Sequence, residues 1–216
     1  MKKYIFLFTL IFSTLQISAQ TFIDRTTAPV PGAARTPEIA SYESFTLKNG
    51  LKVFVVENHK LPRITMRLIL ERDPIVEGDK AGYVQIAGDL IGAGTKSKTK
   101  AEIDEAIDFM GASFSTSSST ITANGLSKYT DKLLSIFSDV LLNPRFSKSE
   151  FSKLKAQMIS GIKSSEDDAD AMSQKLTQAS IYGLNHPYGE VLTEATVNSI
   201  KLEDCKSYWE TYFRPN

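Results

Sequence analysis

The sequence predicts an α+β fold in which an antiparallel sheet is flanked by helices. Strand patterns occupy the first part of the fold and amphipathic helical patterns follow, with a Ser- and Thr-rich stretch of strand character between two of the helices. This order differs from the strict alternation of strand and helix that builds a parallel sheet. A length of 216 residues with 42% hydrophobic content suffices for one globular domain with a sizeable core.

The strands are predicted from alternation and turn chemistry. Asn49-Gly50 lies between two alternating runs, which predicts a hairpin with a type I′ turn whose second strand continues to Val56. Residues 64–70 alternate between apolar and polar and predict a third, half-buried strand. Residues 112–127 are rich in Ser and Thr, but their β-branched and aromatic members favour one or two strands over a loop.

Apolar residues at helical spacing predict helices over residues 81–93, 100–111, 129–142, 148–163, 170–182 and 202–212. Ser147, followed by Glu150 three residues later, predicts a capping box for the fourth of these helices. Cys205 is the only cysteine, so no intrachain disulfide can form. It lies in the last predicted helix, where we interpret it as a plain buried thiol.

The N-terminal residues predict secretion rather than structure. Residues 1–19 combine a positive start, an apolar run and a small residue before the cleavage point, which is the pattern of a signal peptide. The run is shorter than the ~20 residues of a membrane span, although an N-terminal anchor helix is the alternative interpretation. Residues 20–41 predict an extended Pro-rich leader, and the fold is expected over residues 42–216 of a periplasmic or secreted protein.

Charge and histidine content narrow the function classes. Lys and Arg number 25 and Asp and Glu number 25, and no basic face stands out, which disfavours nucleic acid as a partner. His59 and His186 are predicted to be loop residues, and neither has the neighbours of a catalytic triad. The acidic run 166–170 lacks the spacing and central Gly of a calcium loop and is interpreted as a solvated helix start.

Several phrases, in this order and spacing, resemble the N-terminal half-domain of the M16 peptidases, the insulinase and pitrilysin family. They are residues 45–53, Ala81-Gly82-Tyr83 with Gly94-Thr95 closing the helix, residues 107–112, 142–146, 186–189 and 212–216. The resemblance is closest to secreted bacterial members. It implies an M16-like half-domain, and because the family continues from Arg214-Pro215-Asn216 into a further strand, it also implies a chain truncated at its C-terminal end.

In the M16 family the chemistry lies on a helix that carries His-x-x-Glu-His, where two histidines grip zinc and the Glu acts as general base. Here these positions read Gln85, Gly88 and Asp89. The resemblance places the distal zinc-binding Glu at Gly161 and a supporting acidic residue at Leu154. At most one carboxylate remains, so we expect no catalytic residue and no metal ligand in this chain. Gly88 costs about 1 kcal/mol against Ala in a helix interior, which indicates either close approach of another backbone or relaxed constraint.

The resemblance therefore implies a non-catalytic M16 domain that binds a peptide or unfolded protein and pairs with a zinc-bearing M16 half-domain or subunit. The peptide would add to the edge of the sheet. No cofactor is expected in this chain, since zinc belongs to the active partner or to a missing region. Two alternatives stay open: a stand-alone peptide-binding protein of the cell envelope, and part of an active zinc metalloendopeptidase whose site lies in the missing region.

Overall fold

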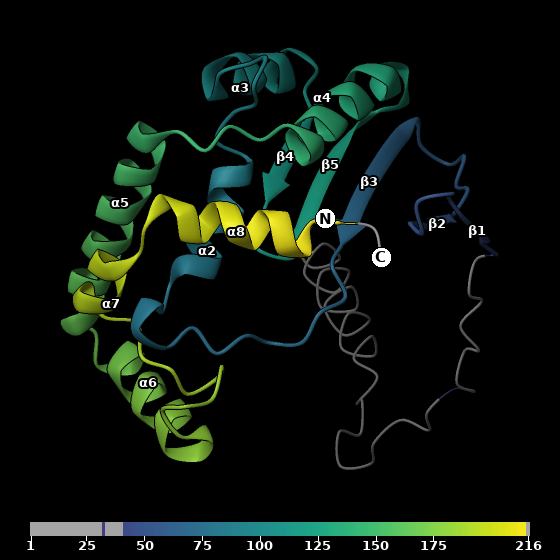
Figure 1. The fold of residues 1–216 in the computed structure, drawn as a ribbon. Helices are drawn as coiled ribbons and strands as arrows, with labels where there is room; N and C mark the ends of the chain where they lie inside the picture. The colour runs from purple at the N-terminus through teal and green to yellow at the C-terminus, as the bar shows by residue number, and fades with distance from the viewer. Residues whose placement is uncertain (1–31, 33–40, 215–216) are drawn as a thin grey trace, which may run out of the picture. The chain divides into compact units, whose positions relative to one another are not determined.

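The computed structural model describes residue 32 and residues 41–214, and Figure 1 shows their arrangement. Contacts divide the chain into residues 1–40 and residues 41–216, and the following description concerns the second unit. The predicted signal peptide and nearly all of the predicted leader lie outside the described residues. Within the described part of the chain, no helix has both the length and the apolar character needed to cross a membrane.

The main sheet has three antiparallel strands in the order β3-β5-β4. Their bounds are Arg63–Ile69 for β3, Ser113–Thr116 for β4 and Thr120–Leu126 for β5. The predicted third strand and the two strands predicted in the Ser- and Thr-rich stretch are thus confirmed. Side chains alternate along β3, so that Ile64, Met66 and Leu68 pack against the core while the residues between them are exposed.

The hydrogen bonds of β5 leave one edge of β4 open. Leu70 N donates to Ser119 O and Ser117 N donates to Thr120 O, so odd-numbered β5 residues bond to β3 and even-numbered ones bond to β4. The backbone groups of Phe114 and Thr116 therefore point away from β5. Among residues 41–214, β5 is the one strand that pairs with β4.

The predicted hairpin forms, but its turn differs from the prediction. β1, Glu43–Thr46, pairs with β2, Lys52–Val55, in a separate two-stranded sheet. Gly50 has a φ of 91°, whereas Asn49 does not take the positive φ that a type I′ turn requires of both central residues. The loop is longer than two residues and is closed by Leu47 N donating to Leu51 O and Gly50 N donating to Leu47 O.

The six predicted helices are confirmed with small shifts at their ends, and one short helix was not predicted. The bounds are Tyr83–Ile91 for α2, Lys100–Phe109 for α3, Thr130–Leu142 for α4, Lys148–Glu166 for α5, Ala169–Tyr182 for α6, Glu194–Ser199 for α7 and Leu202–Tyr212 for α8. Two 3-10 turns, η2 at Gly78–Lys80 and η3 at Ser127–Tyr129, precede α2 and α4. Helix α7 was missed because six residues are too few to show a helical period.

The fold has a capping box at a different helix from the one that the sequence predicts. Ser147 precedes α5 but makes no capping hydrogen bond, because its hydroxyl bonds instead to Ser149 Oγ at 2.8 Å. The predicted capping box is therefore wrong. Thr99 forms a complete capping box at α3 with Glu102, whose carboxylate accepts from Thr99 N at 2.7 Å.

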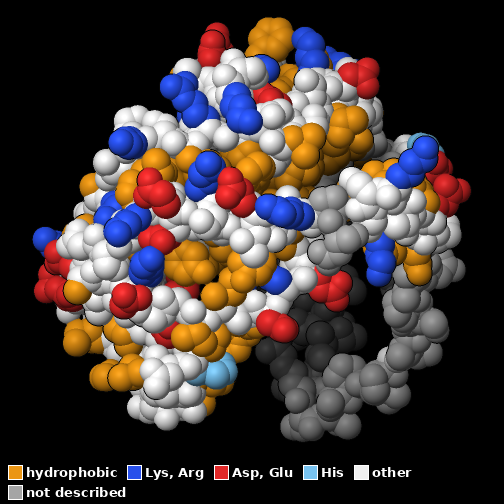
Figure 2. All heavy atoms as spheres, in the orientation of Figure 1, with side chains coloured by type: hydrophobic (Ala, Val, Ile, Leu, Met, Phe, Trp, Pro, Cys, Tyr) orange, Lys and Arg blue, Asp and Glu red, His pale blue; other side chains and the backbone are white. Residues whose placement is uncertain are grey.

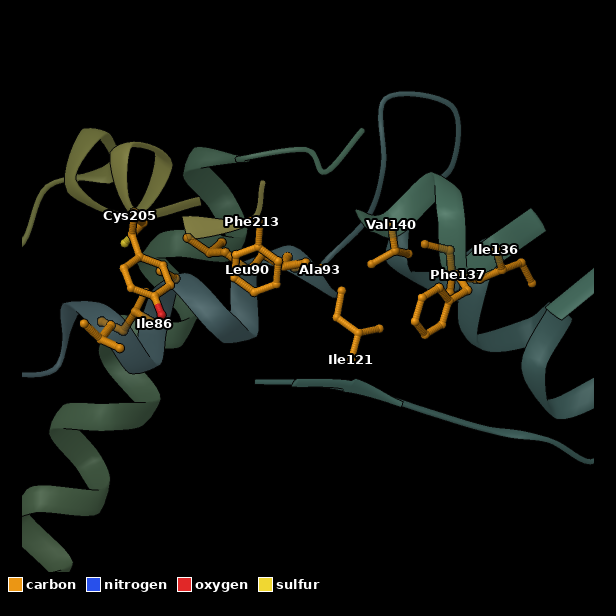
Figure 3. Close-up of a cluster of buried hydrophobic side chains, with 14 of the residues drawn as sticks. Ile86, Leu90, Ala93, Ile121, Ile136, Phe137, Val140, Cys205 and Phe213 are labelled. Atoms are coloured by element: carbon orange, nitrogen blue, oxygen red, sulfur yellow. The ribbon is translucent and has the colours of Figure 1, made fainter. Parts of the chain in front are cut away.

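Helix α2 lies at the centre of the hydrophobic core. It packs against α8 and α5, and its Ile86, Leu90 and Ile91 are fully buried. Ile121 of β5 and Cys205 of α8 are also fully buried and belong to the same cluster as Ile86 and Leu90, as Figure 3 shows. Six of the nine residues of α2 are buried, so the helix that carries the degenerate motif is also the main packing element of the fold.

Candidate functional site: the zinc-motif pocket

Helices α2 and α5 line opposite walls of one pocket of about 430 Å³. Gln85 and Asp89 line it from α2, and Leu154 and Gly161 line it from α5. These are four of the five positions that the sequence resemblance assigns to the zinc site. The structure thus brings together residues 65 or more positions apart in the sequence. The remaining lining residues are Gln157, Met158, Ile162, Ser165, Lys175 and Leu192.

The α2 wall offers one neutral amide and one carboxylate. Gln85 and Asp89 are four residues apart and share a helix face. Gln85 is exposed and Asp89 is half-buried. Burial raises the pKa of the Asp89 carboxyl. Among the described residues no hydrogen-bond donor reaches this carboxylate within bonding distance, so its charged form has little compensation for lost water.

Gly88 does not line the pocket. It faces the turn between β4 and β5, where a Cβ atom would lie 2.8 Å from Ser118 Cα and closer still to Ser118 N and the carbonyl carbon of Ser117. Of the two interpretations left open by the sequence, the structure supports close approach of another backbone. The position that resembles the family's general base is therefore a packing contact.

The residues present do not fit a zinc ion. Zinc sites are built from Cys, His and carboxylate ligands, and hydrolytic sites need three of them plus water. The pocket offers one carboxylate, at Asp89, while Gln85 has a neutral amide and Gly161 has no side chain. In residues 41–214 and at residue 32, no three His, Cys, Asp or Glu side chains come together in a way that could hold a metal ion. No hydrolytic step can be assigned to this set of residues.

Lys175 also lines the pocket, and no pattern in the sequence predicts this. Its ammonium donates to Ser165 Oγ at 2.8 Å and thereby joins α6 to the last turn of α5. Lys175 reaches the pocket because α6 begins just after Asp167 and packs against α5. This packing depends on tertiary contacts, so spacing along the sequence cannot reveal it.

Three other sequence interpretations are confirmed. His59 is exposed beside Glu57, and His186 stabilises its own loop by accepting from Tyr188 N at 3.2 Å. The carboxylate of Asp168 caps α6 by accepting from the amides of residues 170 and 171, at 2.9 and 3.1 Å. Cys205 is buried, and burial raises the pKa of its thiol to about 12, as expected of a plain buried thiol.

Charge is mixed over the surface. On the face shown in Figure 2, blue and red side chains are interspersed and neither sign forms a broad area. This distribution agrees with the zero formal net charge. An electrostatic attraction for long polyanions is therefore not supported by this face.

Comparison with known proteins identifies the family. The model of the family described as Insulinase (Peptidase family M16) matches residues 77–193, which is more than half of the chain. The chain belongs to the M16 family. The matched region contains both walls of the pocket, so the M16 positions on α2 and α5 lie within it.

Proteins of low sequence identity match this chain in sequence or in structure. The chain is 26% identical over 184 residues to the uncharacterised zinc protease YmxG of Bacillus subtilis, covering 80% of this chain and 44% of that protein. The structure of a peptidase M16 inactive domain from Pseudomonas fluorescens matches with a TM-score of 0.71 at 21% identity, over 78% of this chain and 43% of the other. The periplasmic protease PqqL of Escherichia coli matches with a TM-score of 0.67 at 15% identity, over 84% and 22%. The chain spans less than half the length of each of these proteins.

Proposed function

We propose that this chain is a non-catalytic M16 domain that holds an extended peptide or unfolded protein beside a zinc-bearing M16 partner. The observation that carries the proposal is the pocket itself, which gathers the M16 motif positions and offers a single carboxylate among them. One carboxylate and one amide cannot hold the zinc ion that would activate water. The chain's contribution to proteolysis would then be binding rather than bond cleavage.

The free edge of β4 supports a role in peptide binding. β4 packs against α2, the helix that lines the pocket. Phe114 and Thr116 direct their backbone N–H and C=O groups away from β5, and in the described residues these groups have no other backbone partner. An extended peptide can pair with such groups as an added strand. A peptide bound there would lie next to the pocket.

We further propose that the protein acts in the periplasm or outside the cell. The support is the signal-peptide pattern of residues 1–19, which lie outside the described residues. Fractionation of cells that express the full-length gene product, with N-terminal sequencing of the mature protein, tests this. Mature protein that starts at Gln20 in the periplasmic or secreted fraction is expected, and full retention of residues 1–19 in the cytoplasm would contradict it.

The loss of catalysis is tested on the full-length gene product. Zinc is measured by elemental analysis, and cleavage of fluorescein-labelled casein, an unstructured protein, is followed with and without a chelator. We expect no stoichiometric zinc and no chelator-sensitive cleavage, with casein binding retained. Zinc near one per chain together with chelator-sensitive cleavage would show that the parent protein is an active peptidase whose site lies outside this domain.

Peptide binding at β4 is tested with a matched pair of edge variants. Thr116→Pro removes an N–H from the free edge of β4, and Arg67→Pro removes an N–H from the free edge of β3 at the other side of the sheet. Casein binding is measured by fluorescence anisotropy. We expect the affinity to fall at least tenfold in Thr116→Pro and to stay near the parent value in Arg67→Pro. A tenfold loss corresponds to about 1.4 kcal/mol of binding free energy. Equal binding by both variants would place the peptide elsewhere.

Partner dependence is tested by co-purification. A tagged form of the full-length protein is recovered from its own cells, and M16 proteins that carry His-x-x-Glu-His are identified by mass spectrometry. Recovery of one such protein in stoichiometric amount is the expected result. Casein binding with no zinc-bearing M16 partner would instead favour a stand-alone binding protein.

A further inference from the structure

The contact between Gly88 and the β4–β5 turn leaves no room for a side chain. An added Cβ would approach Ser118 Cα to 2.8 Å, and it would come nearer still to two other backbone atoms of the turn, where real Cβ atoms are essentially never found. Backbone atoms cannot rotate aside as a flexible side chain can. The turn must move if residue 88 is to have any side chain.

The turn is held in place from its other side. Tyr208 of α8 is almost fully buried, and its hydroxyl donates to Ser118 O at 2.6 Å. Arg72 Nε donates to the same hydroxyl at 2.8 Å, and its guanidinium lies over the Tyr208 ring. A backbone bond from Leu70 N to Ser119 O, at 2.8 Å, fixes the next residue of the turn to the end of β3. Movement of the turn away from α2 would break these bonds.

A second glycine, one helical turn further on, also lies close to the β4 side of the hairpin, but its neighbour is a side chain. A Cβ at Gly92 would lie 3.2 Å from Thr116 Cγ2 and closer to Thr116 Oγ1. Gly88 and Gly92 are four residues apart, at the end of α2, and so they share one face of the helix. This face receives the end of β4 and the turn that follows it.

We infer that the β4–β5 turn closes the general-base position of this M16 domain, so that Gly88 is a packing residue for the turn that follows β4. Helix α2, which carries the motif positions, packs against the end of β4 and the turn that follows it. Restoring the missing zinc-site side chains alone therefore cannot restore hydrolysis. Gly161, on the opposite wall of the pocket, differs in kind. An added Cβ there meets nothing within 4 Å, so this position is simply vacant.

The inference rests on the same pocket as the proposed function, but its test needs no peptide and no partner. Gly88→Ala and Gly161→Ala make the same chemical change in the two helices that line the pocket, one at a packed position outside it and one inside it. We expect Gly161→Ala to leave Tm unchanged or raise it slightly, because Ala favours a helix over Gly. Gly88→Ala should lower Tm by about 4 to 10 °C, because overpacking outweighs that gain. Loss of soluble Gly88→Ala protein while Gly161→Ala folds would also support the inference, whereas a Tm of Gly88→Ala at or above the parent value would overturn it.

A reconstruction provides a second test. The three-ligand variant Gln85→His/Asp89→His/Gly161→Glu is compared with the same variant carrying Gly88→Glu as well, by Tm, zinc content and casein cleavage with and without a chelator. Addition of Gly88→Glu is expected to lower Tm and to produce no chelator-sensitive cleavage. Chelator-sensitive cleavage at an unchanged Tm would overturn the closure of the position, while leaving the zinc-free state of the natural chain untouched.

Discussion

The two helical walls of the pocket differ in how tightly each is packed. Helix α2 has six buried residues among nine, whereas α5 has one, Ile162, among nineteen. The glycines at two motif positions therefore differ in what surrounds them. Gly88 permits a close backbone contact, and Gly161 faces open space. A glycine can thus be required by the packing of one helix of a site and leave empty space on the other helix.

The largest expected effect is the loss of stability when an apolar side chain of α2 or α5 is truncated. Leu90 of α2 is fully buried, and Leu90→Ala should lower the free energy of unfolding by about 2 to 5 kcal/mol. Leu154 of α5 is half-buried at the pocket, so Leu154→Ala should cost less than half as much. Urea denaturation of both variants measures this difference. Equal losses would show that the α5 wall is as tightly packed as the α2 wall.

The next effect concerns the anchor of the turn. Tyr208→Phe removes a buried hydroxyl that donates to Ser118 O and accepts from Arg72, and a loss of about 1 to 3 kcal/mol is expected. Tyr182 at the end of α6 is about half exposed, and Tyr182→Phe serves as the control with little expected change. Stability is read from thermal unfolding followed by circular dichroism. A neutral Tyr208→Phe would mean that the turn keeps its place without this anchor.

A smaller difference in stability is expected between replacing Thr99, which caps α3, and replacing Ser147, which precedes α5 without capping it. Thr99→Ala removes the capping box of α3 and should cost about 1 kcal/mol. Ser147 occupies the same position before α5 but makes no capping bond, so Ser147→Ala should change stability by no more than a few tenths of a kcal/mol. Chemical denaturation of the two variants decides between them, and the reverse order would contradict the assignment of the caps.

The smallest effect is a pH dependence at the start of α2. Glu77 Oε2 accepts from Gly82 N at 2.9 Å and from Val84 N at 3.1 Å. Burial raises the pKa of its carboxyl, and the nearby Glu190 carboxylate adds to the shift. The folded state therefore binds this proton more tightly than the unfolded state, and the resulting stabilisation is present below pH 4.5 and lost as pH rises through the raised pKa.

Glu77→Gln keeps an oxygen acceptor but cannot ionise. Its Tm relative to the parent should therefore increase from pH 4 to pH 7. Glu190→Gln is the comparison, since Glu190 accepts from the backbone amides of residues 77 and 78 and contributes a smaller part of the shift. A difference in Tm between Glu77→Gln and the parent that is constant with pH would show that Glu77 titrates normally.

Local patterns in the sequence predicted the elements well because their signals are short in range. The alternation of residues 64–70 predicted strand β3, and the helical period of residues 202–212 predicted helix α8. The predicted type I′ turn at Asn49 and the predicted capping box at Ser147 do not form, because other local hydrogen bonds form in their place.

Tertiary contacts explain what the sequence could not predict about the pocket. The motif resemblance selected Gln85, Asp89, Leu154 and Gly161, which do line one pocket. It did not reveal that Gly88 faces the Ser117–Ser118 backbone, since that contact depends on how the hairpin packs on α2. Lys175 was missed for the same reason, because only the packing of α6 on α5 brings it to the pocket.

The buried thiol of Cys205 can report when helix α8 separates from helix α2. It is the only cysteine in the sequence, it packs against α2 in the core, and its pKa of about 12 leaves almost no thiolate at neutral pH. A thiol reagent should react with the native chain only when α8 separates from α2, so the labelling rate measures that opening. A cysteine introduced on the surface would then react alone, which allows fluorescent probes to be attached at the β4 edge without first removing a native thiol.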